Sequence, residues 1–188
     1  MRQKGINTAY YGSEKSIMDA FSKLLGENHS FNIRPGDITK KAGLAKSSFY
    51  IHYRSVPDLI EVNEQKVLNS VTEAIGVNGF DILSPETKWR NILMNLYKYH
   101  EILGIMMKAR NYELSEKILD KIEKNVIICP QNQKIMNDNL MNITRKCLMS
   151  ELDLWSNEDF DVDEISSHAH RLAYISTCAP RFFWQIFG

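Results

Sequence analysis

The chain contains 188 residues, and its 23 basic and 23 acidic side chains give a formal net charge of zero. Three cysteines, Cys129, Cys147 and Cys178, lie far apart, and their odd number argues against a disulfide framework or a cysteine-cluster metal site. We expect reduced thiols that are buried or partly buried. Because no run of about 18 apolar residues is present and the first residues are polar, we expect a cytoplasmic protein with no membrane partner.

Charge is unevenly distributed along the sequence. Residues 1–60 carry nine Lys and Arg and five Asp and Glu, a net charge of +4, which leaves −4 for the remainder. A basic N-terminal region suits phosphate binding, because neutralised phosphates release counterions whatever the base sequence. A difference of a few charges is also common on solvated surfaces. The charge pattern therefore supports nucleic-acid binding only together with a motif.

The first residues predict an arm followed by a helix. Residues 1–12 carry Arg2, Lys4 and two tyrosines without a helical period, so we expect them to be disordered. Such an arm is either a frayed terminus or a contact to the minor groove or phosphates. Ser13 is expected to cap a helix that extends to about Leu25.

Residues 37–59 predict two short helices joined by a tight turn. Gly43 can take the left-handed conformation that ends the first helix at Ala42. Apolar positions spaced by four residues predict a second helix over residues 45–53 with one buried face. Its opposite face is polar and basic, with Lys46, Ser47, Tyr50 and Arg54. Two helices joined by a short turn that contains Gly are typical of helix-turn-helix DNA-binding proteins, whose second helix enters the major groove.

This segment resembles the DNA-binding segment of the tetracycline-repressor (TetR) family of bacterial transcription regulators. The matching residues are Ala42-Gly43-Leu44, Lys46, Phe49-Tyr50-Ile51-His52-Tyr53 and Leu59. The resemblance covers about residues 13–60 by motif and the remainder only by length and helical layout. It implies that Tyr50 and His52 contact phosphates and that the start of the second helix contacts bases. The DNA-binding residues that it implies are Lys46, Ser47, Ser48, Tyr50, His52 and Arg54.

Two positions depart from the family pattern. Ala45 stands where the family usually has a Ser that caps the recognition helix, so that cap is absent or moves to another residue. Val56 stands where the family usually has a Lys that contacts a phosphate, and Arg54 could replace that contact. These departures leave open a TetR-like protein that has lost DNA affinity and acts as a co-regulator.

The remaining sequence predicts further helices and no strands. Ser55 and Ser84 are suitable caps, and Pro57 and Pro85 suit first helical turns. The expected helices cover about residues 57–75, 88–109, 112–125 and 134–155, with a last one that opens at Asp161. Gly104 could break the second of these, and Pro180 should end or kink the last.

The predicted fold class is therefore all-α and TetR-like, with about nine helices. A three-helix helix-turn-helix head is expected over residues 1–60 and a helical effector-binding and dimerisation body over residues 61–188.

Two sets of body residues have a predicted role. Aromatic and Met side chains could line an effector cavity or belong to ordinary core: Trp89, Met94, Tyr97, His100, Met106, Met107 and Tyr112. Apolar stripes on the last two long helices predict a homodimer interface formed by Leu148, Leu152, Leu172, Ile175, Phe182 and Phe183. In the TetR family these helices pair with their copies in a four-helix bundle.

No motif indicates an enzyme, a cofactor or a metal site. The acids of residues 159–163 resemble a calcium loop, but Glu164 replaces the required Gly and His170 the closing Glu. His168 and His170 are two residues apart and point to different sides of a helix, so a shared metal site is not expected. We expect both at the surface or in an interface. No Gly-rich phosphate loop, nucleophile elbow or pair of catalytic acids is found.

The sequence therefore predicts a homodimeric transcription regulator, most often a repressor in this family, that binds a pseudo-palindromic operator in double-stranded DNA. A small-molecule effector would bind the body and change the separation of the two heads. The alternatives are a co-regulator that acts through protein contacts with weak or no DNA binding, and an enzyme that uses a body cavity but lacks a supporting motif.

Overall fold

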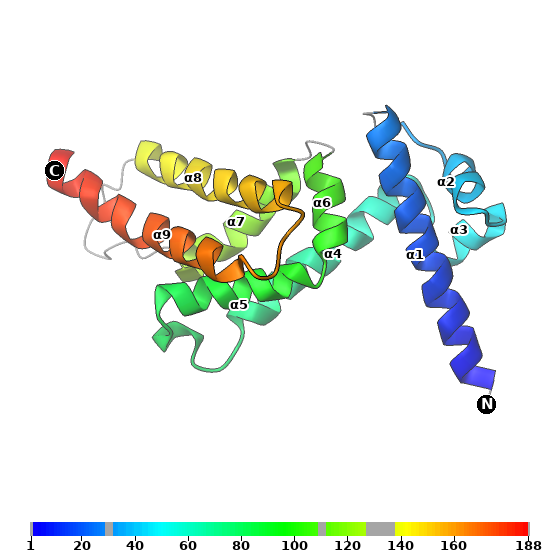
Figure 1. Cartoon of the computed structure of the whole chain (residues 1–188), viewed down its shortest axis with the longest axis horizontal. Coiled ribbons are helices and arrows are strands. Elements are labelled where there is room, and N and C mark those ends of the chain that lie inside the picture. The colour runs from blue at the N-terminus through cyan, green and yellow to red at the C-terminus, as the bar shows by residue number, and fades with distance from the viewer. Residues whose placement is uncertain (1, 29–31, 109–111, 127–137, 188) are drawn as a thin grey trace. The chain divides into compact units, whose positions relative to one another are not determined.

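The computed structural model describes residues 2–28, 32–108, 112–126 and 138–187, with fewer of the side chains described towards the ends of several helices. In these ranges the chain forms nine α-helices and one short 3-10 helix and no strand, which confirms the all-α prediction (Figure 1). The helices are α1 (Arg2–Asn28), α2 (Pro35–Ala42), α3 (Lys46–His52), α4 (Val56–Ile75), η1 (Phe80–Ile82), α5 (Pro85–Tyr97), α6 (His100–Lys108), α7 (Tyr112–Val126), α8 (Asp138–Asn157) and α9 (Ile165–Phe187).

The chain divides into two compact units within α4. The first unit contains α1 to α3 and α4 as far as Gln65, and the second begins at Lys66 and includes α5 to α9. The sequence placed this boundary after residue 60. The difference arises because Asn63 is buried against the first unit, where its Nδ2 lies 3.4 Å from Sδ of Met18 in α1.

The first unit is built around α1, which packs against both α2 and α3. Its fully buried side chains are Ile17, Phe21, Ile38, Phe49 and Leu59. Because α1 already begins at Arg2, the prediction of a disordered arm over residues 1–12 is wrong. Ser13 does not cap the helix; its hydroxyl donates to the carbonyl of Tyr10 one turn earlier, at 2.8 Å. A serine hydroxyl that donates to a carbonyl one turn earlier belongs to a helix interior, whereas a capping hydroxyl accepts from the backbone N–H groups that follow it.

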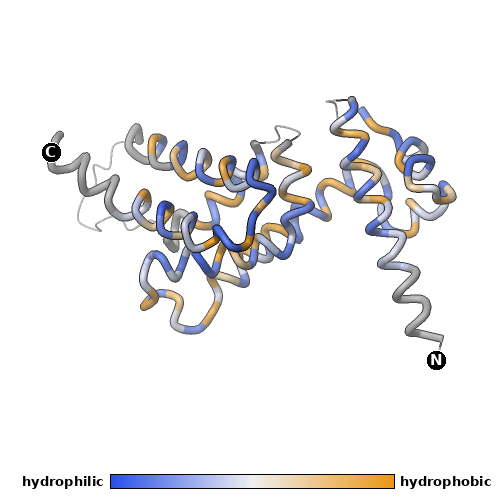
Figure 2. The backbone as a smooth tube through the Cα atoms, in the orientation of Figure 1, coloured by the Kyte–Doolittle hydropathy of each residue, from blue (hydrophilic) through white to orange (hydrophobic). Residues whose placement is uncertain are grey.

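In the second unit α9 packs against both α5 and α8, and α7 also contacts α5 and α8. Large side chains fill the space between these helices, including Trp89 of α5, Trp155 of α8 and Leu172 of α9, all fully buried. Nε1 of Trp89 donates to Oγ of Ser176 at 3.0 Å, so the one polar atom of this indole is satisfied inside the core. Figure 2 shows apolar and polar stretches alternating along these helices, as expected for helices with one buried face.

The predicted helix over residues 88–109 is two helices, and its break lies elsewhere than expected. Ser84 caps α5 as predicted, accepting from the backbone N–H of Thr87 at 3.2 Å. The chain leaves the helix after Tyr97 and resumes at His100, whose Nδ1 lies 2.8 Å from the carbonyl oxygen of Tyr97. Gly104, the expected break, lies inside α6.

The connection between α8 and α9 contains two residues with left-handed backbone. Asp159 has φ 52° and Phe160 has φ 57°, values that are uncommon for residues with a side chain. Asp161 does not open the last helix as predicted, because its Oδ1 accepts the backbone N–H of Asp163 at 2.9 Å in a turn. The helix begins at Ile165 instead and continues past Pro180, which does not end it.

Candidate nucleic-acid interface

The turn between α2 and α3 forms as the sequence predicts. Gly43 has φ 67° and ψ 29°, the left-handed conformation that glycine adopts without a steric penalty. The backbone N–H of Leu44 donates to the carbonyl of Thr39 at 2.9 Å, which satisfies one carbonyl at the end of α2. Three residues, 43–45, therefore separate two short helices, the spacing found in helix-turn-helix units.

α3 is held by one apolar face. Phe49 is fully buried and Tyr53, which ends the helix, is 2% exposed. At the start of the helix Ala45 provides no side-chain cap, so the cap that the resemblance expects is absent at this position. Packing of Phe49 and Tyr53 against the first unit, rather than capping, therefore positions this helix.

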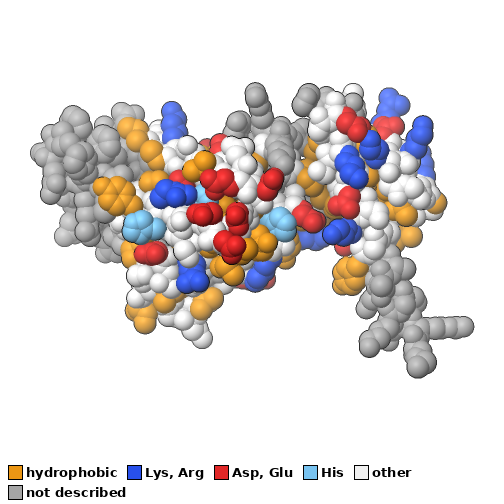
Figure 3. Space-filling model, viewed as in Figure 1, with side chains coloured by type: hydrophobic (Ala, Val, Ile, Leu, Met, Phe, Trp, Pro, Cys, Tyr) orange, Lys and Arg blue, Asp and Glu red, His pale blue; other side chains and the backbone are white. Residues whose placement is uncertain are grey.

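The opposite face of α3 is open to solvent. Lys46, Ser47 and Tyr50 are exposed, Tyr50 by 52%, whereas Ser48 is half-buried. Ile51 is 66% exposed on the same face and was not among the residues predicted to bind DNA. The signal was present in the spacing, because Ile51 stands four residues after Ser47 and so shares its side of the helix. Figure 3 shows several Lys and Arg side chains over the visible side of this unit.

His52 has a structural contact inside the unit. Its Nε2 lies 2.8 Å from Oγ of Ser13, and its ring centroid lies 4.1 Å from that of Tyr10. The single hydroxyl proton of Ser13 is donated to the carbonyl of Tyr10. Nε2 of His52 must therefore be the donor in its bond to Ser13. This nitrogen ties the end of α3 to α1, so a phosphate contact through Nε2 would have to replace the bond to Ser13, and the predicted role of His52 stays a prediction.

Arg54 follows α3 and is paired with Asp58. Nη2 of Arg54 lies 3.0 Å from Oδ1 of Asp58, and the backbone N–H of Arg54 donates to Oδ2 at 2.7 Å. That backbone N–H and then the guanidinium lower the pKa of Asp58 below its ordinary value. The Arg54 side chain is 92% exposed and presents a cation that is already paired. Val56 is buried, so it anchors the start of α4 in the core.

A buried polar cluster joins α1, α3 and α4. The Tyr53 hydroxyl donates to Oε1 of Glu14 at 3.1 Å and accepts from Nδ2 of Asn63 at 3.3 Å. Burial is the main cause that raises the pKa of Tyr53 well above its ordinary value, and the nearby Glu14 carboxylate acts in the same direction. The backbone N–H of Asp58 also donates to Oγ of Ser55, the predicted cap of α4. These bonds fix the base of α3 against both neighbouring helices.

The residues proposed to line an effector cavity do not share one environment. Trp89 and Met106 are fully buried, which fits the ordinary-core alternative. Met94 is 44% exposed on the outer side of α5, so it does not face the core with them. Tyr97 and His100 are half-buried and stack on each other with centroids 4.8 Å apart. Met107 is half-buried, and the side chain of Tyr112 lies outside the described residues.

Half of the predicted dimer interface is core of the chain itself. Leu148, Leu152 and Leu172 are at most 3% exposed, because α8, α9 and α5 cover them. Ile175 is half-buried, and the side chains of Phe182 and Phe183 lie outside the described residues. The prediction was wrong for the three leucines because it assumed that one chain has too few helices to bury both stripes.

The exposed apolar residues of α8 occupy another face. Ile143 and Leu154 are each 43% exposed, and Cys147 is exposed, whereas the prediction was a buried or partly buried thiol. These positions are separated by four and seven residues, so they lie along one side of the helix. On α9, Tyr174 is 64% exposed. The exposed apolar side chains described on α8 and α9 are therefore these, and not the three buried leucines.

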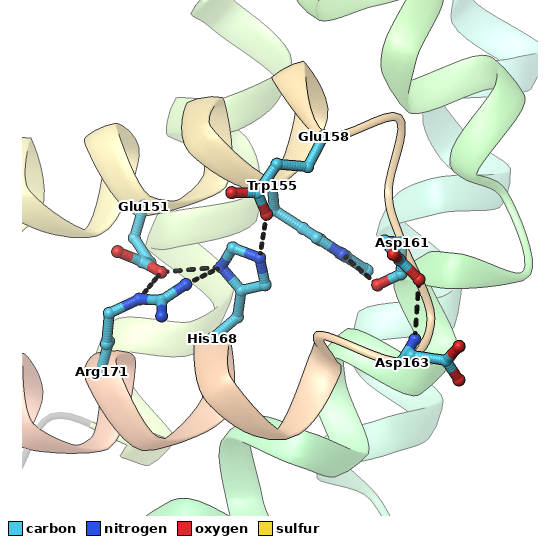
Figure 4. Close-up of polar contacts among 7 residues, drawn as sticks. All are labelled: Glu151, Trp155, Glu158, Asp161, Asp163, His168 and Arg171. Carbon is cyan, nitrogen blue, oxygen red and sulfur yellow. Dashed lines mark hydrogen bonds and ion pairs between the residues drawn. The ribbon is translucent and has the colours of Figure 1, made fainter.

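His168 is fully buried inside the chain itself, which corrects its predicted position at the surface or in an interface (Figure 4). Its Nδ1 lies 2.7 Å from Oε1 of Glu151 in α8, and its Nε2 lies 2.9 Å from Oε2 of Glu158 in the connection. Nε of Arg171 donates to the same Glu151 oxygen at 2.5 Å. The cluster therefore ties α8, the connection and α9 together. His170 is exposed, and its Nδ1 lies 3.5 Å from a Glu86 oxygen.

Within the described ranges, no group of three or more His, Cys, Asp and Glu side chains is placed to hold a metal ion. At His168 this follows from geometry, because its two ring nitrogens face different carboxylates and cannot converge on one ion. Among the helices that the structure describes, none combines the length and apolarity needed to cross a membrane.

In comparisons with protein families, characterised proteins and solved structures, nothing matches this chain.

Proposed function

We propose that the chain is a DNA-binding transcription regulator similar to the TetR family, most simply a repressor. The observation that carries this proposal is the exposed face of α3, where Lys46, Ser47 and Tyr50 stand opposite the buried Phe49. A cation and two hydroxyls on the open side of a second short helix are donors for base edges and phosphates. The net charge of +4 over residues 1–60 favours the same polyanionic partner.

The regulator would act as a homodimer, because two recognition helices must meet successive major grooves about 34–36 Å apart. The exposed line of Ile143, Cys147 and Leu154 on α8 supports a partner copy at this face. A charge placed there, as in Leu154→Glu, should give monomers and weaken operator binding although α3 is untouched. Arg90→Glu, an exposed change on α5, is the control that should leave both properties unchanged. Sedimentation of the wild-type chain as a monomer at micromolar concentration would contradict the dimer.

Regulation by a small molecule is the third part of the proposal. α4 belongs to both units, so a ligand bound by the second unit could shift the populations of α4 positions that suit DNA. This part requires a ligand that weakens operator binding and, by linkage, binds more weakly to the DNA-bound protein.

A co-regulator that binds protein instead of DNA is the second candidate. Specific observations favour it: Ala45 provides no cap, Nε2 of His52 is bonded to Ser13, and Arg54 is paired with Asp58. Selection of host genomic fragments by the purified protein separates the two candidates. Enrichment of a pseudo-palindromic sequence supports the regulator. Recovery of no enriched sequence by a correctly folded dimer supports the co-regulator.

A further inference from the structure

Ile51 is the most exposed large apolar side chain among the described residues of the first unit, followed by Tyr11 at 65%. Its exposed fraction of 66% exceeds the 37% of Val62 in α4, whereas Ile38 of α2 and Leu59 of α4 are fully buried. Packing of α3 does not require it, because Phe49 and Tyr53 supply the buried face. An aliphatic side chain left open on this helix is therefore free to act on a partner.

Ile51 lies on the same open face of α3 as the polar residues of that helix. Successive residues on an α-helix are about 100° apart, so Ser47 and Ile51 form one row and Lys46 and Tyr50 form the row beside it. Each row has a polar residue towards the start of α3 and a bulkier residue towards its end. The open face thus combines a cation, two hydroxyls and one aliphatic group.

This combination matches the major groove better than a protein surface. Among the four bases only thymine presents a methyl group in the groove, beside acceptors and donors for polar side chains. A protein partner that covered Ile51 would also have to cover the Lys46 ammonium in the next row, and burial of an unpaired charge is costly. The +4 charge of residues 1–60 makes a polyanion the complementary occupant.

We propose that Ile51 is a specificity-determining residue that packs against the C5-methyl group of a thymine in each operator half-site. This inference rests on the proposed DNA-binding function and adds a base identity to it. Ile51 would select thymine through apolar contact alone, whereas Tyr50 would contact phosphate through its hydroxyl and carry no base preference. The operator therefore contains a T·A pair whose methyl group contributes to affinity.

Replacement of thymine by deoxyuridine tests this contact, because it removes the methyl group and keeps every hydrogen-bonding atom of the base pair. The operator selected by the full-length wild-type protein would carry this replacement at one symmetric thymine pair at a time. Burial of one carbon group is worth about a fourfold change in affinity, so one replacement should weaken binding by about fourfold per half-site, or about 15-fold for the dimer.

The Ile51→Ala variant supplies the decisive comparison. Because Ile51 is exposed and Ala favours helix, the variant should fold as the wild type does. It should bind the thymine and deoxyuridine operators equally at the critical position. Tyr50→Phe is the matched control on the same face, and it should weaken both operators while it keeps the ratio between them.

Four results would overturn the inference. Wild-type affinity that is unchanged by deoxyuridine at every thymine, or a methyl preference that persists in Ile51→Ala, would remove Ile51 from base reading but leave the proposed function in place. Failure to select any DNA sequence would overturn the proposed function together with the inference. Release of a co-purifying protein by Ile51→Ala, with the thymine preference unchanged, would assign the residue to a protein contact.

Discussion

Oγ of Ser13 in α1 lies 2.8 Å from Nε2 of His52 in the last turn of α3, a contact that joins residues 39 positions apart. Removal of the hydroxyl in Ser13→Ala leaves the half-buried ring N–H without this acceptor. We expect a loss of about 1 kcal/mol in the free energy of unfolding, measured by urea denaturation. DNA affinity should fall modestly as well, because the end of α3 loses one anchor.

Ser16→Ala is the matched control for this contact. Ser16 is a serine of the same helix whose hydroxyl donates only to the carbonyl of Gly12, at 2.9 Å. Its loss should cost little, since the hydroxyl makes no contact with another helix in this bond. Equal destabilisation by the two variants would contradict the role given to the Ser13–His52 bond.

Gly104 gives space for Phe160. A Cβ atom at residue 104 would lie 3.1 Å from Cε2 of Phe160, whose ring is buried and packs edge-on against Trp155 with centroids 4.9 Å apart. Because the ring is confined, Gly104→Ala should destabilise the protein by about 1–2 kcal/mol despite the better helix propensity of Ala. Gly12→Ala in α1 meets no atom within 4 Å and should instead be neutral or stabilising by up to about 1 kcal/mol. Thermal denaturation of the two variants measures the contrast, and a stabilised Gly104→Ala would refute the packing role.

The raised pKa of Tyr53 predicts a loss of stability in alkaline solution. Its pKa is raised in the folded protein, mainly by burial, so the folded state keeps the phenol proton above the pH at which the unfolded chain releases it. The folded state then binds more protons, and the free energy of unfolding falls by up to about 1.4 kcal/mol per pH unit above about pH 10. In Tyr53→Phe the part of this alkaline fall in stability that Tyr53 causes should disappear. The variant should be less stable at neutral pH, because the bond to Glu14 is lost. Urea denaturation between about pH 9 and 11 compares the two slopes, and identical slopes would contradict the prediction.

The carboxylates around His168 should differ in importance. The Glu151 side chain is 10% exposed, accepts from Nε of Arg171 and lies 2.7 Å from Nδ1 of His168. The Glu158 side chain is 41% exposed and lies 2.9 Å from Nε2 of His168. Glu151→Gln should therefore cost about 2 kcal/mol, because it removes the charge of a nearly buried carboxylate that contacts both Arg171 and His168. Glu158→Gln should cost less than about 1 kcal/mol, since solvent screens an exposed pair. Chemical denaturation gives both values, and a larger loss for Glu158→Gln would contradict this ranking.

The elements that the sequence predicted well depend on local signals. Gly43 ends α2, Ser84 caps α5 and Ser55 contacts the start of α4, and each of these features involves residues within one turn of the chain. The periodic spacing of Phe49 and Tyr53 likewise indicated the buried face of α3. Such signals can be recognised from the sequence alone, because they do not depend on contacts between distant residues.

The features that the sequence missed depend on contacts between distant residues. An apolar stripe at Leu148 and Leu172 predicts burial but does not say whether the chain or a partner covers it. The burial of His168 requires Glu151 from the preceding helix, and the role of Gly104 becomes clear only beside Phe160. No Gly or Pro stands at the helix break after Tyr97, so the sequence does not indicate this break.

The measurement that tests DNA binding most directly is a salt titration of affinity for the selected operator with wild type and Lys46→Ala. Counterion release predicts that wild-type affinity falls by at least about tenfold between about 50 and 200 mM salt. If Lys46 contacts phosphate, the Lys46→Ala variant should bind more weakly, and its logarithmic salt slope should be smaller by about one per protomer. If Lys46 instead contacts a guanine, the variant should lose the preference for that base at one base pair. Wild-type affinity that does not depend on salt, or a Lys46→Ala variant with unchanged affinity, slope and base preference, would contradict the proposal that α3 binds DNA.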